Sequence, residues 1–265
     1  MCTLVALHRV VPRTRLLVAA NRDEFFDRPG EGPALRATAS GVLLAPRDAV
    51  GGGTWFGLNR FGVFAALTNV ACSAPDSGHR SRGLLIVDTL AAKSANQAAE
   101  KIRGLPMDVY NPFNLFVADA EEAFCFSYEG RVRGVPNTSG LFLLGNTPLD
   151  EPEPPKLAAL RERVEAALAE PSEGWLERLG DWCGDHASAG PRGPLDALCV
   201  HTPTYGTRSS CLLQLADGGL EDSHSVFRFA DGAPCEESYE DFTPLLRDLG
   251  QGWSGAHGVR VRSHR

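Results

Sequence analysis

The sequence predicts an α+β fold in which β-sheets are covered by helices. Expected strands cluster near both ends of the chain and expected helices form separate blocks, an order typical of α+β proteins and unlike alternating α/β ones. Several expected strands, such as Leu16–Ala20, are continuously apolar, which indicates sheets buried on both faces. Layers of sheet between layers of helix satisfy both observations.

The first third of the chain is expected to form mainly strands. Pro12-Arg13-Thr14-Arg15 separates two apolar runs, Cys2–Leu7 and Leu16–Ala20, and this spacing predicts a β-hairpin. Asn59-Arg60-Phe61-Gly62 is the expected turn between two later strands. Further strands are expected over Val42–Ala45, Thr54–Leu58 and Val63–Thr68.

Helices are expected in the middle of the chain. One covers Ser81–Ala92, and a second starts at Ser94, where Ser94-Ala95-Asn96-Gln97 fits a capping box. Apolar residues at helical spacing predict an amphipathic helix over Lys156–Ala169, and another helix begins near Ser172. The remaining expected strands are Asn114–Ala118, Ala123–Tyr128, Arg131–Val135, Leu141–Leu144, Ala197–His201, Ser209–Leu215 and Ser223–Phe229.

The 265 residues are interpreted as one domain over residues 1–249, followed by a flexible tail over 250–265. A cluster of prolines from Pro148 to Pro155 does not divide the chain, because polar motifs that belong together fall on both sides of it. The composition, 43% hydrophobic and 22% charged, is that of an ordinary globular protein.

Charge and cysteine usage exclude several classes of partner. The net charge of −7 argues against nucleic acid and anionic membranes as partners. There is no apolar run near the roughly 18 residues that a membrane span needs, so no stable membrane insertion and no secretory signal are expected. Seven scattered cysteines without a C-x-x-C pair predict a reducing, cytoplasmic location. The oligomeric state is not determined by the sequence.

Cys2 is the first candidate functional residue. Its small side chain permits removal of Met1, which would leave a thiol and a free α-amine on one residue. Reference pKa values of about 8.5 for the thiol and about 7.7–8.0 for the amine place both groups near neutral pH. This is a nucleophile with its own general base. Alone, however, Cys2 also fits a small buried residue at the start of a strand.

Other polar residues follow apolar runs in the same manner. Asn21-Arg22-Asp23-Glu24 comes directly after one expected strand, Asn69 and Asn146 each close another, and Arg208 precedes Ser209–Leu215. Each alone is a common turn residue. Together with Cys2, they indicate a site along one edge of a sheet.

Seven short motifs, in order from residue 1 to about 216, resemble the NRDE family, which is the transport and Golgi organisation protein two family. That family in turn resembles the N-terminal nucleophile hydrolases, above all the choloylglycine hydrolase and penicillin V acylase branch. The motifs are Met1-Cys2-Thr3, Asn21-Arg22-Asp23-Glu24, Gly52-Gly53-Thr54-Trp55, Ala65-Ala66-Leu67-Thr68-Asn69, Ser81-Arg82-Gly83, Asn111-Pro112-Phe113-Asn114-Leu115 and Tyr205-Gly206-Thr207-Arg208-Ser209-Ser210.

This resemblance implies a four-layer αββα sandwich of the N-terminal nucleophile hydrolase type. It also implies that Cys2 is the nucleophile, that Asp23 orients the α-amine, and that Asn69 and Asn146 lie near the oxyanion and the amine. Arg208 matches the late arginine that sets the field around the thiolate. Supporting or substrate-binding roles are expected for Asn21, Arg22, Glu24 and Trp55.

One departure from the branch affects the charge around the nucleophile. The branch usually carries an Arg two residues before its Asp, and that position here is Asn21, with Arg22 directly beside Asp23. Since neighbours on a strand point to opposite faces, Arg22 is expected to point away from Cys2. Arg208 alone would then supply the positive charge. In addition, Leu149–Lys156 lacks the family's usual Trp before its Pro-Lys.

The expected function is therefore a cytoplasmic amidohydrolase that cleaves a C–N bond of a small acylated substrate, without a cofactor. The alternative is a non-catalytic carrier of haem or an acyl lipid, as eukaryotic members of the family are linked to haem trafficking and lipid homeostasis. No metal site is expected, because His186, His201 and the other histidines show no ligand spacing. Gly51-Gly52-Gly53 is interpreted as a turn, since no Lys follows it as in a phosphate loop.

Overall fold

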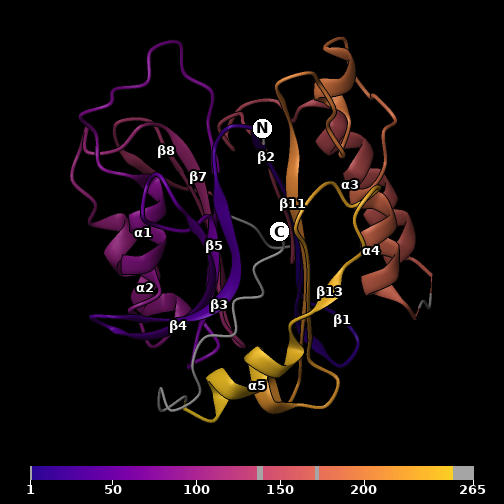
Figure 1. Ribbon diagram of the computed structural model, residues 1–265. Coiled ribbons are helices and arrows are strands. Elements are labelled where there is room, and N and C mark those ends of the chain that lie inside the picture. The colour runs from indigo at the N-terminus through magenta and orange to yellow at the C-terminus, as the bar shows by residue number, and fades with distance from the viewer. Residues whose placement is uncertain (1, 136–139, 171–172, 253–265) are drawn as a thin grey trace.

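A computed structural model describes residues 2–135, 140–170 and 173–252. Two antiparallel sheets face each other, with helices on the outer face of each (Figure 1). The first sheet is six-stranded, in the order β10-β1-β2-β11-β12-β13. Its strands are β1 (Thr3–Val11), β2 (Thr14–Phe25), β10 (Leu141–Leu144), β11 (Tyr205–Ala216), β12 (Val226–Ala230) and β13 (Glu240–Asp241).

The second sheet is seven-stranded and follows the chain order from β3 to β9 without a crossover. It is therefore a simple meander, in which each strand pairs with the next one along the chain. Its strands are β3 (Gly30–Thr38), β4 (Gly41–Asp48), β5 (Phe56–Asn59), β6 (Phe64–Asn69), β7 (Phe113–Ala118), β8 (Ala123–Tyr128) and β9 (Val132–Val135).

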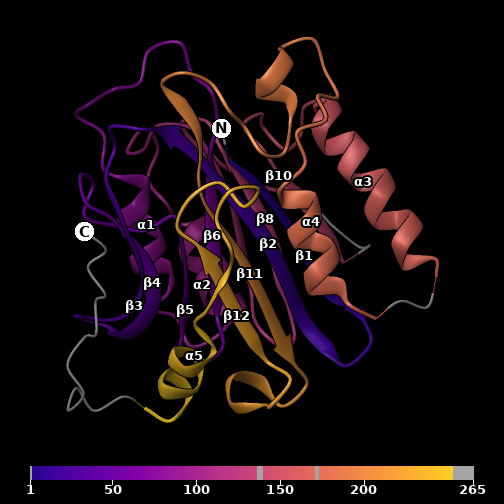
Figure 2. The same cartoon turned by 45° about the vertical axis from the view of Figure 1, so that its right-hand side comes forward.

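The helices complete a four-layer αββα sandwich, which confirms the predicted fold class. Helices α1 (Arg82–Thr89) and α2 (Ala95–Arg103) cover the second sheet, and α3 (Pro155–Leu168) and α4 (Trp175–Cys183) cover the first (Figures 1 and 2). Helix α5 (Thr243–Gly250) packs at one end of the sandwich. In the described part of the chain, no helix has both the length and the apolar character needed to cross a bilayer.

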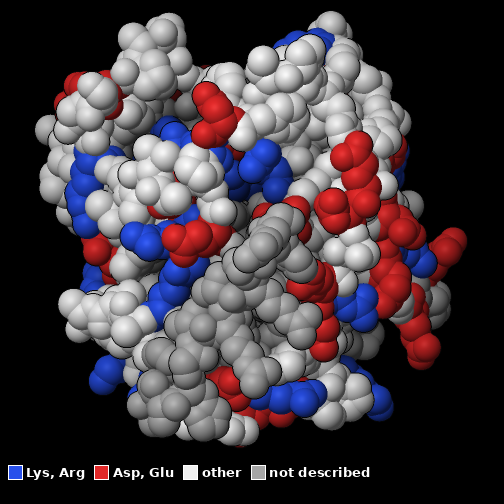
Figure 3. Space-filling model, in the orientation of Figure 1, with Lys and Arg blue, Asp and Glu red and all other residues white. Residues whose placement is uncertain are grey.

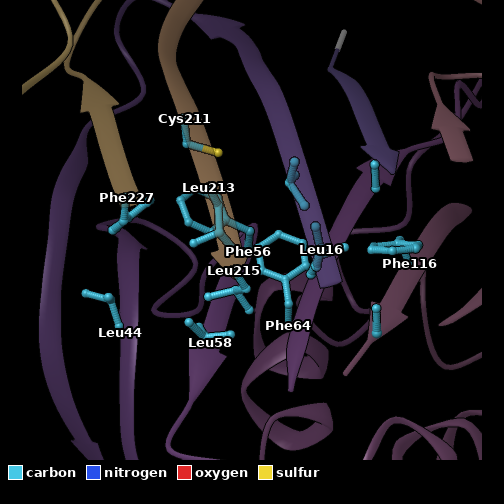
Figure 4. Close-up of a cluster of buried hydrophobic side chains, with 14 of the residues drawn as sticks. Leu16, Leu44, Phe56, Leu58, Phe64, Phe116, Cys211, Leu213, Leu215 and Phe227 are labelled. Carbon is cyan, nitrogen blue, oxygen red and sulfur yellow. The ribbon is translucent and has the colours of Figure 1, made fainter. Parts of the chain in front are cut away.

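Strand alternation produces three separate apolar layers. In β2, Leu16 and Val18 point toward the second sheet, whereas Leu17 and Ala19 point toward α3 and α4. The layer between the sheets is rich in aromatic rings, among them Phe56 and Phe64 (Figure 4). This burial on both faces explains why the central strands read as continuous apolar runs.

Most predicted elements are present, and the differences have physical reasons. The Pro12–Arg15 hairpin and the Lys156–Ala169 helix are confirmed, the latter as α3. Edge strand β3 was not predicted, because glycine, proline and charged residues interrupt its apolar pattern. Conversely, Ala197–His201 forms no strand, only an isolated bridge from His201 to Gly206.

One further difference, and two expectations that the described residues do not cover, concern the second half of the chain. Helix α5 was not predicted, and it ends at Gly250, the first residue of the expected tail. Most of that tail, residues 253–265, lies outside the described residues, as does Ser172, the expected start of the helix that the structure begins at Trp175.

Candidate active site

The register between β1 and β2 determines which side chains surround Cys2. Thr3 pairs with Asn21 and Leu4 with Ala20, so the next position along places Cys2 opposite Arg22. Directly opposed residues share a face of the sheet. Cys2 and Arg22 therefore face the space between the two sheets, and Asn21 and Asp23 face the helices. The expectation that Arg22 points away from Cys2 is wrong, because it is Asp23 that lies on the other face.

Cys2 lines a cavity of about 480 Å³ at one end of the sandwich. Four arginines line the same cavity, namely Arg22, Arg28, Arg80 and Arg82. In Figure 3, basic side chains gather in the hollow between the two halves, near the N-terminus marked in Figure 1. A second cavity of about 360 Å³ near Gly250 is lined by neither cysteine nor histidine. The first cavity is therefore the candidate site.

Arg22 is held in place on two sides. Its guanidinium lies 4.5 Å from the centre of the Trp55 ring, and its Nη2 is 3.8 Å from a carboxylate oxygen of Glu24. A buried guanidinium on an aromatic face keeps its charge and direction. All three side chains line the cavity with Cys2.

The thiol of Cys2 responds to opposing effects. Burial raises its pKa, whereas the backbone N–H of Asp23 and the charge of Arg22 lower it. Burial has the larger effect, so the pKa of the thiol is above its ordinary value. Burial thus favours the protonated form of the thiol.

Asp23 lies behind Cys2, on the helix side of β2, in a wholly protein environment. Its Oδ1 accepts a hydrogen bond of 2.7 Å from the hydroxyl of Thr207. Burial raises the pKa of Asp23, and the charge of Lys156 counteracts this. Lys156, at the start of α3, is only 3% exposed, and its Nζ has no hydrogen-bond partner among the described residues. Burial lowers the pKa of Lys156, while Asp23 and Cys2 raise it.

Asn69 and Asn146 come together although they are 77 residues apart. The side-chain amide of Asn146 donates a hydrogen bond of 2.5 Å to the backbone oxygen of Asn69. The side chain of Asn69 lines the cavity with Cys2. The Oδ1 atom of Asn146 is buried and accepts no hydrogen bond from any described residue. The side-chain amide of Asn69 and the Oδ1 atom of Asn146 are therefore available to bind a further group at the site.

Asn21 supports the strand from the helix side, whereas Arg208 lies away from the cavity that it was expected to serve. Asn21 donates two hydrogen bonds of 2.9 Å, to the carbonyls of Cys183 and Leu198, and thereby ties β2 to the layer behind it. The guanidinium of Arg208 lies 5.8 Å from the centre of the Phe26 ring, and Arg208 does not line the cavity. Among the described arginines, Arg22 rather than Arg208 therefore lies opposite Cys2.

Three residues of the site were missed in the sequence. Lys156 and Thr207 hold Asp23 from the helix side, and Arg82 lines the cavity while its Nη1 donates a hydrogen bond of 2.8 Å to Pro112 O. Thr207 and Arg82 lie within motifs that support the family resemblance, whereas Lys156 lies outside them. What the motifs could not give was the face to which each side chain points.

A close backbone contact forms the edge of the cavity. A Cβ atom on Gly53 would lie 2.1 Å from the carbonyl carbon of Gly83, so no larger residue fits there. Thr54 N–H donates a hydrogen bond of 3.1 Å to Gly83 O across the same contact. The loop Gly51-Gly52-Gly53 thus seats the start of α1, and Arg82 with it, against the sheet.

Comparison with known families agrees with this arrangement. The family described as Transport and Golgi organisation 2 matches residues 1–220, more than three quarters of the chain. The chain belongs to this family. A human member, "Transport and Golgi organization protein 2 homolog", is 30% identical over 257 residues, covering 86% of this chain and 92% of its own. The mouse homolog is 27% identical with the same coverage. The predicted family is thereby confirmed.

Solved structures similar to this family member are N-terminal nucleophile hydrolase folds. Two variants of the conjugated bile acid hydrolase from Clostridium perfringens give TM-scores of 0.55 and 0.58, each at 12% identity and covering 93% of this chain and 94% of theirs. A Caenorhabditis elegans N-acylethanolamine-hydrolyzing acid amidase ortholog gives 0.52 at 11% identity, covering 80% and 92%. At these identities the similarity establishes the fold.

Proposed function

We propose that this protein is a cytoplasmic N-terminal cysteine amidohydrolase that cleaves a C–N amide bond of a small acylated substrate. The observation that carries the proposal is the placement of Cys2 in a cavity opposite Arg22, with Asp23 directly behind it. The similarity of the fold to an amidase and a bile acid hydrolase supports it. Removal of Met1 creates the free α-amine on which the chemistry depends.

In the first half of the reaction, the α-amine of Cys2 takes the thiol proton and the sulfur attacks the substrate carbonyl. Asp23, held by Thr207, accepts a hydrogen bond from this amine and orients it. The side-chain amide of Asn69 donates to the oxyanion, a contact whose loss typically costs about 10²–10³ in rate. The ammonium then returns its proton to the leaving nitrogen, and the C–N bond breaks.

In the second half, water hydrolyses the acyl-thioester. The neutral α-amine takes a proton from the water as its oxygen attacks the carbonyl carbon, and the C–S bond breaks. The proton then goes to the sulfur, which restores the thiol and releases a carboxylic acid. Arg22 stabilises the thiolate when it forms and when it leaves, because its guanidinium is fixed against Trp55.

One arginine of the cavity, Arg82, favours a substrate that carries an acidic group. Arg28 is paired with Asp48 at 2.6 Å, and Arg80 is paired with Asp88 at 2.7 Å. Arg82 forms no salt bridge with a described residue and donates only to the Pro112 carbonyl. Its remaining donors can bind a carboxylate in a bidentate manner.

A carrier of haem or an acyl lipid is the second candidate function; the human and mouse homologs are named for transport and Golgi organisation, which favours a trafficking role without naming a cargo. In such a carrier, Cys2 would only fill space in the cavity and would not act as a nucleophile. Binding would then survive Cys2→Ala, and bound haem would give a Soret absorption band. A hydrolase would instead lose turnover in this variant.

The decisive experiment is intact-mass spectrometry of the purified protein before and after a limiting amount of a β-lactone or another thiol-directed acyl probe. We expect loss of Met1 and one acyl adduct that is absent in Cys2→Ala, whereas Cys72→Ser keeps it as the matched control. An acyl-amide library with acidic and neutral members then identifies the substrate. Retention of Met1, or labelling that survives Cys2→Ala, would overturn the proposal.

A further inference from the structure

Two histidines and two cysteines converge at a surface site away from the Cys2 cavity. His186 follows α4, Cys199 and His201 precede β11, and Cys235 lies between β12 and β13. One ligand atom of each residue can be chosen so that all four lie within 4.8 Å of one another. None of these four side chains lines the Cys2 cavity.

The distances within this cluster match those around a tetrahedral metal ion. Cys199 Sγ is 3.6 Å from Cys235 Sγ, and His201 Nε2 is 3.5 Å from Cys199 Sγ and 3.2 Å from Cys235 Sγ. With Zn–S near 2.3 Å and Zn–N near 2.0–2.1 Å, tetrahedral geometry requires about 3.8 Å between sulfurs and about 3.6 Å between sulfur and nitrogen. The rings of His186 and His201 have centres 5.0 Å apart, so His186 can supply the fourth ligand.

We propose that His186, Cys199, His201 and Cys235 bind one Zn²⁺ ion in a closed structural site. Two thiolates and two imidazoles in a tetrahedral arrangement are a ligand set typical of zinc, and four protein ligands leave no position for a substrate. On binding, the two thiol protons leave to solvent. Nε2 of His201 faces the two sulfurs, and its Nδ1 lies 4.0 Å from a carboxylate oxygen of Glu236.

Hydrogen bonds from Val200 to Thr207 and from Thr207 to Asp23 connect the zinc site to the candidate active site. Val200 lies between ligands Cys199 and His201. Its N–H donates a hydrogen bond of 2.9 Å to Thr207 Oγ1, and its carbonyl accepts one of 2.9 Å from Thr207 N–H. The hydroxyl of Thr207 in turn donates to Asp23. Zinc therefore fixes the segment that positions Thr207, and through it Asp23. The zinc site does not depend on the proposed hydrolysis.

Metal analysis of untagged full-length protein tests this proposal. We expect about one zinc per chain, and after chelation under reducing conditions Co²⁺ should give thiolate-to-cobalt charge-transfer and tetrahedral d–d bands. Cys235→Ser and His186→Ala should abolish the charge-transfer band or change it, whereas the matched controls Cys72→Ser and His224→Ala should keep it. Cys2→Ala should also keep it, which separates this test from that of the proposed function.

Thermal unfolding provides a second readout. Chelation should lower the melting temperature of the wild type and leave that of Cys235→Ser unchanged. The proposal is overturned if the protein contains little zinc and Co²⁺ gives no thiolate band, or if the bands persist in both ligand variants. A Cys199–Cys235 disulfide in freshly prepared protein, seen as a mass loss of two hydrogens under non-reducing conditions, would also overturn it.

Discussion

Asp23 and Lys156 are an acidic and a basic side chain, each 3% exposed, that interact electrostatically behind Cys2. Burial raises the pKa of the acid and lowers the pKa of the amine, and the attraction between the two charges opposes both shifts. Neither residue lines the Cys2 cavity. The pair therefore acts on Cys2 from within the protein, through the α-amine that Asp23 holds in the proposed mechanism.

Lys156→Met should move the pH dependence of Cys2 reactivity. Without the lysine charge, the pKa of Asp23 rises further, and a protonated Asp23 no longer holds the α-amine in its basic orientation. We expect the acidic limb of the pH–rate profile for alkylation of Cys2 to shift to higher pH. Lys101→Met, at an exposed position of α2, is the control. A profile that superimposes on the wild type would exclude the electrostatic role of Lys156.

Lys156 should also make folding stability depend on pH in the alkaline range. Burial lowers the pKa of Lys156 in the folded protein below 10.5, the ordinary value for lysine, which applies to the unfolded chain. Between the folded and the unfolded pKa, the unfolded chain therefore binds more protons than the folded one. Stability then rises with pH across this window. Urea unfolding at several alkaline pH values should show that Lys156→Met lacks this rise, whereas Lys101→Met keeps it. Equal slopes in both variants would contradict the assignment.

The sequence predicts the architecture well because its apolar patterns are local. The Pro12–Arg15 hairpin, α3 and the capping of α2 by Ser94 each depend on a few adjacent residues. Strand β3 could not be predicted, because glycine, proline and charged residues interrupt its apolar pattern. Helix α5 buries Leu246 and Leu249 at helical spacing, but it is only eight residues long and was missed.

The candidate site was predicted in composition but not in orientation. The motifs predicted that Cys2 and Asp23 lie at the same edge of a sheet. Only the pairing register between β1 and β2 shows that Arg22 shares a face with Cys2. Lys156 comes from a helix far along the chain, so no spacing argument connects it with Asp23. The His186 cluster was missed for the same reason, since its fourth ligand, Cys235, lies more than thirty residues after the others.

Gly53→Ala should destabilise the protein. The added methyl group would overlap with the backbone of Gly83, and overpacking of this kind typically costs about 1–3 kcal/mol, occasionally more. Urea unfolding measures the loss. Gly104→Ala is the control, because its Cβ would meet only ordinary contacts at 3.6 Å and beyond. Unchanged stability of Gly53→Ala would mean that the contact between this loop and α1 is looser than the structure describes.

Arg22→Lys and Arg208→Lys should separate the two candidate cations. The lysine at position 22 loses the planar contact with Trp55, so its charge is no longer fixed beside Cys2 and the pKa of the thiol rises. A rise of one unit would reduce the rate of Cys2 alkylation at neutral pH about tenfold, since only the thiolate reacts. Arg208→Lys changes only a contact with Phe26 and should react as the wild type does. The reverse result, a slow Arg208→Lys and a normal Arg22→Lys, would return the charge-stabilising role to Arg208.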